Sequence, residues 1–162
     1  MARSGAFPER TSPRSRDSNP EPLGAGPALI RTGTLLTGIY EGHARELGLT
    51  PQQARLLFVV AEEPDNMLGL GATVRLGKST MTSLVDRMEE LGLLERSADA
   101  RDRRRLVVTA TARGKEVSSA FEKAMRASIT TITSPLNEVE LSALARILSV
   151  ILVKADDLLP SE

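Results

Sequence analysis

The spacing of apolar residues between positions 78 and 91 predicts an amphipathic helix near the middle of the chain. Five apolar side chains recur there at intervals of three and four residues, which places them on one side of a helix: Met81, Leu84, Val85, Met88 and Leu91. The opposite side begins with a lysine and small hydroxyl residues, so its first turns are narrow enough to enter a DNA major groove. The candidate DNA-contacting residues on this helix are Lys78, Ser79, Thr80, Thr82, Ser83 and Arg87.

A charged β-hairpin is predicted directly after this helix. Gly92 ends the helix, and residues 93–96 and 106–109 read as two short strands. The connection between them carries four arginines against two aspartates. Guanidinium groups pair with phosphates or base edges, although a charge run in a hairpin is also common as a solvated turn. Its place after a helix with a polar, groove-sized face favours nucleic-acid binding, and the pattern is that of a winged helix.

Further elements are predicted on both sides of this region. Helical spacing of apolar residues indicates helices at residues 27–48, 50–63, 114–133 and 141–159, and a short apolar segment lies at 70–76. The second of these helices begins with the sequence TPQQ, which has the form of a capping box with proline at the first helical position. Its expected core positions are Ala54, Leu57, Phe58 and Ala61. A turn at Gly77 is expected to lead into the central helix, as helix-turn-helix geometry requires.

The central helix and hairpin resemble the winged helix-turn-helix core of the MarR family of transcriptional regulators. The family pattern in the wing is D-P-R-D-R-R, followed by an apolar strand, a threonine and a glycine. Here the corresponding residues are Asp99, Ala100, Arg101, Asp102, Arg103 and Arg104, then strand 106–109, Thr111 and Gly114. Ala100 replaces the usual proline, and Ser83 stands where many members carry arginine, so the resemblance implies no particular operator sequence.

The resemblance covers residues 27–159 and implies roles for individual residues. It implies that Arg104 enters the minor groove with Asp102 as its partner, and that Arg101 and Arg103 belong to the same wing. It also implies that small phenolic or aromatic effectors bind between the first helix and the DNA-binding lobe. Tyr40 and His43 lie on that helix and are the candidate ligand-binding residues, although a lone histidine is more often a surface residue and a lone tyrosine usually packs in the core.

The last predicted helix carries more apolar surface than a terminal helix of a small monomer normally exposes. One interpretation is that it packs on the first and fifth helices of its own chain. The resemblance implies instead that the first, fifth and sixth helices of two protomers interlock. We therefore expect a homodimer that presents two recognition helices to an inverted-repeat operator in double-stranded DNA.

Composition narrows the possible functions. The chain of 162 residues is long enough for one domain with a real core, and its formal net charge is zero, so any affinity for nucleic acid must come from a local patch. The absence of cysteine excludes disulfides, thiolate catalysis, thiol redox sensing and cysteine-ligated metals. With a single histidine and no Gly-rich phosphate loop, we expect no enzyme, no cofactor and no metal.

These observations combine into one expectation for the whole chain. Residues 1–26 are expected to be a disordered tail, because they are rich in Arg, Ser, Pro and Gly and poor in apolar residues; an arginine arm that contacts DNA is the alternative. Residues 27–159 are expected to form one mainly α domain with a small β-hairpin wing. Residues 50–110 would form its winged helix-turn-helix DNA-binding lobe, and residues 27–48 and 111–159 its helical dimerisation region.

The expected function is therefore sequence-specific DNA binding by a dimeric transcriptional repressor that a small aromatic ligand relieves. The alternative is a winged helix used for protein contacts or for architectural DNA binding without ligand control. No apolar run reaches the roughly 18 to 20 residues that span a bilayer, and the N-terminus lacks an apolar signal core. We accordingly expect no membrane association and a cytoplasmic location.

Overall fold

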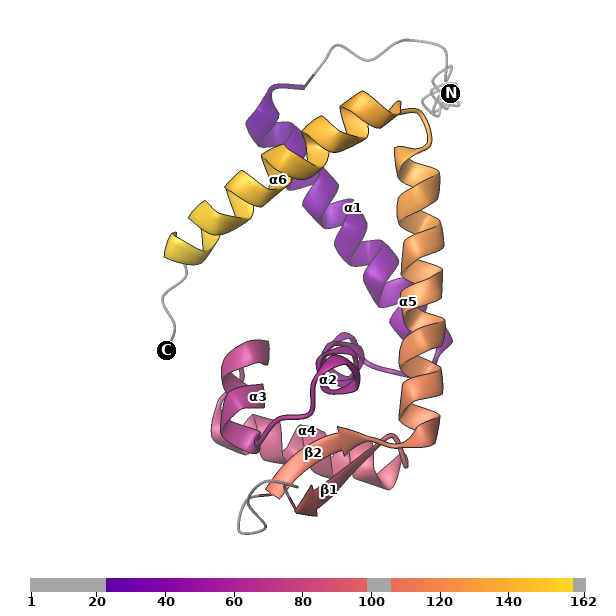
Figure 1. Cartoon of the computed structure of the whole chain (residues 1–162), viewed down its shortest axis with the longest axis vertical. Coiled ribbons are helices and arrows are strands. Elements are labelled where there is room, and N and C mark those ends of the chain that lie inside the picture. Colours follow the sequence, from indigo (N-terminus) through magenta and orange to yellow (C-terminus); the bar gives the residue numbers. More distant parts are fainter. Residues whose placement is uncertain (1–22, 99–105, 159–162) are drawn as a thin grey trace, which may run out of the picture. The chain divides into compact units, whose positions relative to one another are not determined.

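The computed structural model describes residues 23–98 and 106–158, which contain six helices and one antiparallel hairpin (Figure 1). The elements in chain order are α1 (Ala25–Glu46), α2 (Pro51–Glu62), α3 (Met67–Val74), α4 (Lys78–Glu90), β1 (Leu94–Ala98), β2 (Leu106–Ala110), α5 (Ala112–Thr133) and α6 (Glu138–Leu158). The chain divides into two units, residues 1–34 and 35–162, and the second contains the hydrophobic core. The predicted fold class, mainly α with a small β-hairpin, is confirmed. Most of the expected N-terminal tail, residues 1–22, lies outside the described residues.

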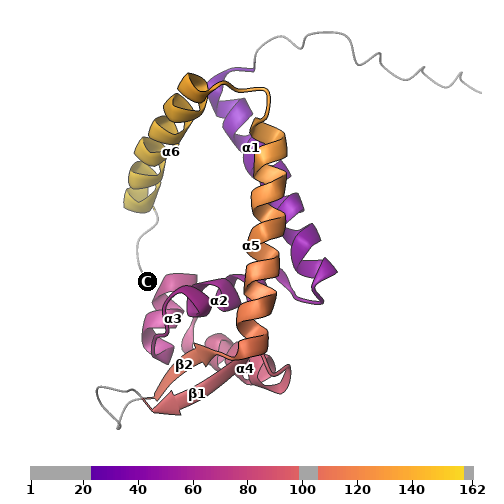
Figure 2. The same cartoon turned by 45° about the vertical axis from the view of Figure 1, so that its right-hand side comes forward.

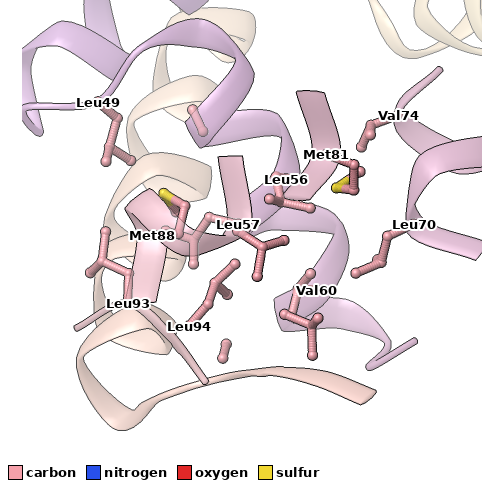
Figure 3. Packing of buried hydrophobic residues seen from close by; sticks show 14 of the residues in the cluster. Leu49, Leu56, Leu57, Val60, Leu70, Val74, Met81, Met88, Leu93 and Leu94 are labelled. Atoms are coloured by element: carbon pink, nitrogen blue, oxygen red, sulfur yellow. The ribbon is translucent and has the colours of Figure 1, made fainter. Parts of the chain in front are cut away.

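The core of the second unit is the apolar centre of the winged-helix lobe. Side chains from α2, α3 and α4 converge on the strands of the hairpin, as Figure 3 shows for the labelled residues. The largest fully buried side chains are Leu56, Leu57, Val60, Leu70, Met81, Val85, Met88, Leu94 and Val108. This cluster fixes α4 and the hairpin in one rigid arrangement, and both views show α4 beside the two strands (Figures 1 and 2).

Helix α2 begins as its sequence predicts. The Thr50 hydroxyl accepts the N–H of Gln53 at 3.2 Å, and the Gln53 side-chain oxygen accepts the N–H of Thr50 at 2.9 Å, which completes the capping box. The buried surface is wider than the predicted stripe, because α2 contacts α3, α5 and β2. Leu56 and Val60 are therefore fully buried, whereas Phe58 is only half-buried.

Helix α3 begins three residues earlier than the apolar segment predicts. Asn66 caps it, because its side-chain oxygen accepts the N–H groups of Leu68 and Gly69 at 3.0 and 3.2 Å. A turn leads into α4 at Gly77, as the sequence predicts. Its left-handed residue is Arg75, with φ of 56°, whereas Gly77 has φ of −63° and serves as the N-cap of α4. Arg75, which carries a Cβ atom, thus adopts a backbone conformation that usually favours glycine.

The hairpin is a regular antiparallel pair with a third attachment at the middle of β2. Leu94 pairs with Ala110 and Ala98 pairs with Leu106. In addition, the Val108 N–H donates to the carbonyl oxygen of Asp65 at 2.9 Å, which joins β2 to the segment before α3. This bond holds the base of the wing against the helix-turn-helix, since Asp65 adjoins the cap of α3.

A threonine and a glycine fasten the end of the hairpin to α5. Thr111 caps α5 by accepting the N–H of Gly114 at 3.0 Å, and its hydroxyl donates to the carbonyl of Gly92 at 2.7 Å. Gly114 packs directly on the backbone of Leu93, so that a Cβ atom at position 114 would lie 2.0 Å from the Leu93 carbonyl oxygen. Only glycine fits at this position without a backbone shift.

Helix α6 exposes a wide apolar surface. Asn137 caps it, with its side-chain oxygen accepting the N–H of Glu140 at 3.0 Å. None of its residues from 138 to 155 is buried. The large exposed side chains are Val139, Leu141, Ile147, Leu148, Val150, Leu152 and Val153. A wide exposed apolar surface of this kind is normally covered by a partner. In the described part of the chain no helix is long and apolar enough to cross a membrane.

Candidate nucleic-acid interface

The polar side of α4 is fully open to solvent. Met81, Val85 and Met88 anchor the helix in the core, and the six candidate residues, Lys78, Ser79, Thr80, Thr82, Ser83 and Arg87, are all exposed. Gly77 supplies no side-chain cap at the start of the helix. An exposed helix N-terminus with a lysine and small hydroxyl residues has the size and the charge to contact the edges of bases and the phosphates of a DNA groove.

The side chains on this face differ in how much of their hydrogen-bonding capacity is already used. The Thr82 hydroxyl donates to the carbonyl of Lys78 at 2.9 Å, so its oxygen remains an acceptor for an outside donor. Arg87 is paired with Glu90 at 2.7 Å in an exposed ion pair. Such a pair contributes little to stability, and its arginine can exchange the carboxylate for a phosphate.

An ion-pair network joins the hairpin to α4. The Arg96 guanidinium in β1 donates to the Asp86 carboxylate at 2.7 Å and also to the Glu89 carboxylate. The Arg96 backbone N–H donates to the second oxygen of Glu89 at 2.9 Å. Arg96 was not predicted from the sequence, although Asp86 and Glu89 stand three residues apart on one helix and an arginine in the adjacent strand is their natural partner. The network holds β1 against α4.

We expect Arg96→Gln to weaken binding to duplex DNA and to lower the free energy of unfolding by about 1 kcal/mol, because Asp86 and Glu89 lose a shared cation. Urea denaturation and fluorescence anisotropy with labelled DNA measure the two effects. The matched control is Glu90→Gln, which breaks only the exposed pair with Arg87 and should change stability by less than about 0.5 kcal/mol. Equal effects of the two variants would contradict a role for Arg96 in positioning the wing.

The four predicted wing residues, Arg101, Asp102, Arg103 and Arg104, lie outside the described residues. The structure places the two ends of the connection that carries them. Ala98 and Leu106, which flank it, are paired across the hairpin. The roles of these four residues remain predictions.

A cavity of about 590 Å³ lies between α1, α2 and α5. It is lined by Tyr40, Arg55, Phe58, Val59, Phe121, Glu122, Met125, Arg126, Ile129 and Thr130. The rings of Tyr40 and Phe121 meet edge to face, with centroids 4.9 Å apart. Partial burial raises the pKa of Tyr40, and nearby Arg55 opposes the shift. The tyrosine hydroxyl is therefore neutral at physiological pH and donates to the Pro51 carbonyl at 3.5 Å.

The two candidate ligand residues have different surroundings. Tyr40 lines the cavity, whereas His43 is not among the lining residues. The His43 ring nitrogens instead lie 2.9 Å from the Ser128 hydroxyl and 3.1 Å from a Glu46 carboxylate oxygen. His43 thereby connects α1 to α5. The sequence predicts Phe58 as an apolar position of its helix but does not single out Arg55, because one arginine on an amphipathic helix gives no signal of its own.

Comparison with known proteins agrees with this architecture. A model of the MarR family matches residues 47–105. YcgE of Bacillus subtilis (strain 168), an HTH-type transcriptional regulator, is 32% identical over 93 residues, which are 56% of this chain. The matched part spans about three fifths (60%) of the length of YcgE.

Solved structures extend the likeness to most of the chain. CouR from Rhodococcus jostii RHA1, solved with p-coumaroyl-CoA bound, is 26% identical and superposes with a TM-score of 0.64 over 78% of this chain and 90% of its own. MarR from E. coli shares the fold, with 18% identity and a TM-score of 0.66 over 82% of this chain and 99% of its own. Residues 47–105 are thus similar to the MarR family of transcriptional regulators, and the chain shares the fold of MarR over most of its length.

Proposed function

We propose that the protein is a sequence-specific DNA-binding transcriptional regulator that acts as a dimeric repressor and is relieved by a small ligand. The observation that carries the proposal is the α4 surface, on which six polar or basic residues stand exposed while the opposite side is locked in the core. The Arg96 network holds the wing strands against the same helix. A groove-reading helix and a flanking basic wing then act as one rigid unit.

Dimer formation is supported by the apolar surface of α6. Seven large apolar side chains of this helix are exposed in the single chain, among them Val139 at 78% and Val153 at 67%. Such a surface is the mark of a protein interface. A second copy is the occupant that also explains DNA recognition, because a two-fold dimer would present two α4 helices to half-sites about 34 to 36 Å apart. The operator would then be an inverted repeat.

A ligand-binding role is supported by the cavity between α1, α2 and α5. Its volume of about 590 Å³ and its mostly apolar lining suit a small aromatic molecule. The solved relative CouR binds p-coumaroyl-CoA, which makes a phenolic compound the first effector class to test. Tyr40 would contact the ligand directly, and His43 would act on the cavity only through the packing of α1 on α5.

The test of the proposed function is a pair of affinities. The intergenic DNA beside the protein's own coding region is compared with a scrambled duplex of the same length, at the same salt concentration, by fluorescence anisotropy. A regulator is expected to prefer the intergenic duplex by about 1,000-fold or more. Equal affinity for both duplexes would favour an architectural DNA-binding module, and no affinity for either would favour a winged helix used for protein contacts.

Removing the predicted wing arginine should separate groove contact from folding. We expect Arg104→Ala to weaken operator binding by about 1 to 3 kcal/mol, or roughly 5- to 150-fold, because one groove contact is lost. The urea midpoint should not change. Arg45→Ala, which removes an exposed arginine from the last turn of α1, controls for the loss of charge alone. An unchanged operator affinity for Arg104→Ala would refute the assignment of the wing.

A further inference from the structure

The hydroxyl group of Thr82 has a fixed hydrogen-bonding direction. Thr82 is exposed on α4, one helical turn after Lys78. Its hydroxyl donates to the Lys78 carbonyl oxygen at 2.9 Å, and a hydroxyl has only one hydrogen to donate. The branched side chain of threonine also has few rotamers in a helix, and the bond to the preceding turn selects one of them. The Thr82 oxygen therefore offers an outside partner an acceptor and no donor.

The other hydroxyl groups on this side of α4 are not committed in the same way. Within residues 23–98 and 106–158, the hydroxyls of Ser79, Thr80 and Ser83 form no hydrogen bond. Each of them can either donate to a base or accept from it, which gives little discrimination between bases. Thr82 thus differs from its neighbours, because its hydroxyl can distinguish a hydrogen-bond donor on a base from an acceptor.

Asp86 places a second acceptor beside Thr82. It lies four residues later on α4, so the two side chains are neighbours on the helix surface. One oxygen of its carboxylate accepts the Arg96 guanidinium at 2.7 Å, and 54% of the side chain is exposed. A carboxylate has no hydrogen to donate, and its negative charge favours an amino group over a carbonyl oxygen. The two side chains therefore favour the same kind of group on a base.

The four bases divide into two classes for such an acceptor. In the major groove, adenine and cytosine present exocyclic amino groups, N6 and N4, which donate hydrogen bonds. Guanine O6 and thymine O4 are carbonyl oxygens, which only accept. An acceptor that meets a carbonyl oxygen gains no hydrogen bond, and both oxygens lose their bonds to water. To donate to such an oxygen, Thr82 would have to give up its bond to the Lys78 carbonyl.

We propose that Thr82 is a specificity-determining residue whose hydroxyl oxygen accepts a hydrogen bond from the exocyclic amino group of an adenine or a cytosine in each half-site. The inference rests on the proposed function, since it requires α4 to enter the major groove of an operator. It adds the chemical class of the base at one position and the atom that recognises it. Lys78 contributes through its backbone carbonyl, which sets the direction of the hydroxyl.

The first experiment locates the base pair. Each base pair of the intergenic duplex is replaced in turn by the other three, and affinities of the wild type and Thr82→Val are measured by fluorescence anisotropy at one salt concentration. Valine keeps the branched shape of threonine and lacks the hydroxyl. We expect Thr82→Val to lose a preference of about tenfold at one position in each half-site and to keep the others. The urea midpoint should not change, because Thr82 is exposed.

The second experiment removes single groups from that base pair. Nebularine in place of adenine, or 2-pyrimidinone in place of cytosine, deletes the amino group. In the partner base, 5-methyl-2-pyrimidinone for thymine, or 2-aminopurine for guanine, deletes the carbonyl oxygen. Loss of the amino group should weaken binding of the wild type by about tenfold and that of Thr82→Val by less than about twofold. Loss of the carbonyl oxygen should affect both proteins equally.

Ser83→Ala is the matched control, because it removes an uncommitted hydroxyl from the next residue of the same helix. We expect this variant to respond to loss of the amino group as the wild type does. Unchanged base preferences in Thr82→Val, or a loss of the difference between the two proteins on deleting the carbonyl oxygen and not the amino group, would overturn the inference. In both cases the wild type still prefers the intergenic duplex. A wild type without that preference would overturn the proposed function, and the inference with it.

Discussion

Leu148→Glu is expected to convert the proposed dimer into a monomer and to weaken operator binding by about 100-fold or more. Leu148 lies on the apolar side of α6 and is 39% exposed in the single chain, so a partner helix can still cover it. A carboxylate at this position would be buried in an apolar interface with no evident partner, which costs more than the contact gains. Each protomer would then hold only one half-site.

Light scattering coupled to gel filtration measures the change in mass, and circular dichroism reports whether helix content is retained. Ser142→Glu is the matched control, because Ser142 is exposed on the polar side of the same helix and a carboxylate near a helix N-terminus is favourable. We expect this control to remain dimeric. A wild type that is monomeric at micromolar concentration, or a Leu148→Glu dimer with full operator affinity, would rule out the assembly through α6.

Gly114→Ala is expected to lower the free energy of unfolding by about 1 to 3 kcal/mol, although alanine favours helices more than glycine does. The added Cβ atom would lie 2.0 Å from the Leu93 carbonyl oxygen. A backbone atom cannot rotate away as the end of a side chain can, so β1 and α5 must separate. The same shift would disturb the bond between Thr111 and the Gly92 carbonyl.

Urea denaturation followed by circular dichroism measures this loss. Gly42→Ala provides the control, because it lies inside α1 and its added Cβ atom would meet no atom within 4 Å. That substitution should be neutral or should stabilise the protein by about 0.5 to 1 kcal/mol. An unfolding midpoint of Gly114→Ala equal to that of the wild type would show that the junction between β2 and α5 tolerates movement.

The elements that could be predicted from sequence are those with a local cause. The capping box at Thr50 and Gln53 and the three- and four-residue spacing in α4 both act within a few residues of the chain. The start of α3 was missed because its cap, Asn66, precedes the apolar segment that marks the helix in the sequence. No local pattern marks Arg75 as the left-handed residue before α4, because its conformation is set by the bond of the Leu76 N–H to the Gly71 carbonyl.

The interface could be predicted only in part for a similar reason. Exposure of the polar side of α4 follows from periodicity, since the opposite side has to be buried. The contacts of Arg96 and Arg55 depend instead on which strand or helix end folds against them. Such pairings join residues that are distant in sequence, between 7 and 18 positions apart here, and no local pattern encodes them.

The hydrogen bond between the Val108 N–H and the Asp65 carbonyl makes one part of the hairpin more firmly held than the other. At its base, β2 is held by β1 on one side and by the segment before α3 on the other. Toward Ala98 and Leu106, the contacts of each strand within the described residues are with the other strand. Local opening can therefore start at the far end of the hairpin and stop at Val108, because that residue is buried and doubly attached. A hairpin of this kind can adjust to the width of a groove while the core and the direction of α4 remain unchanged.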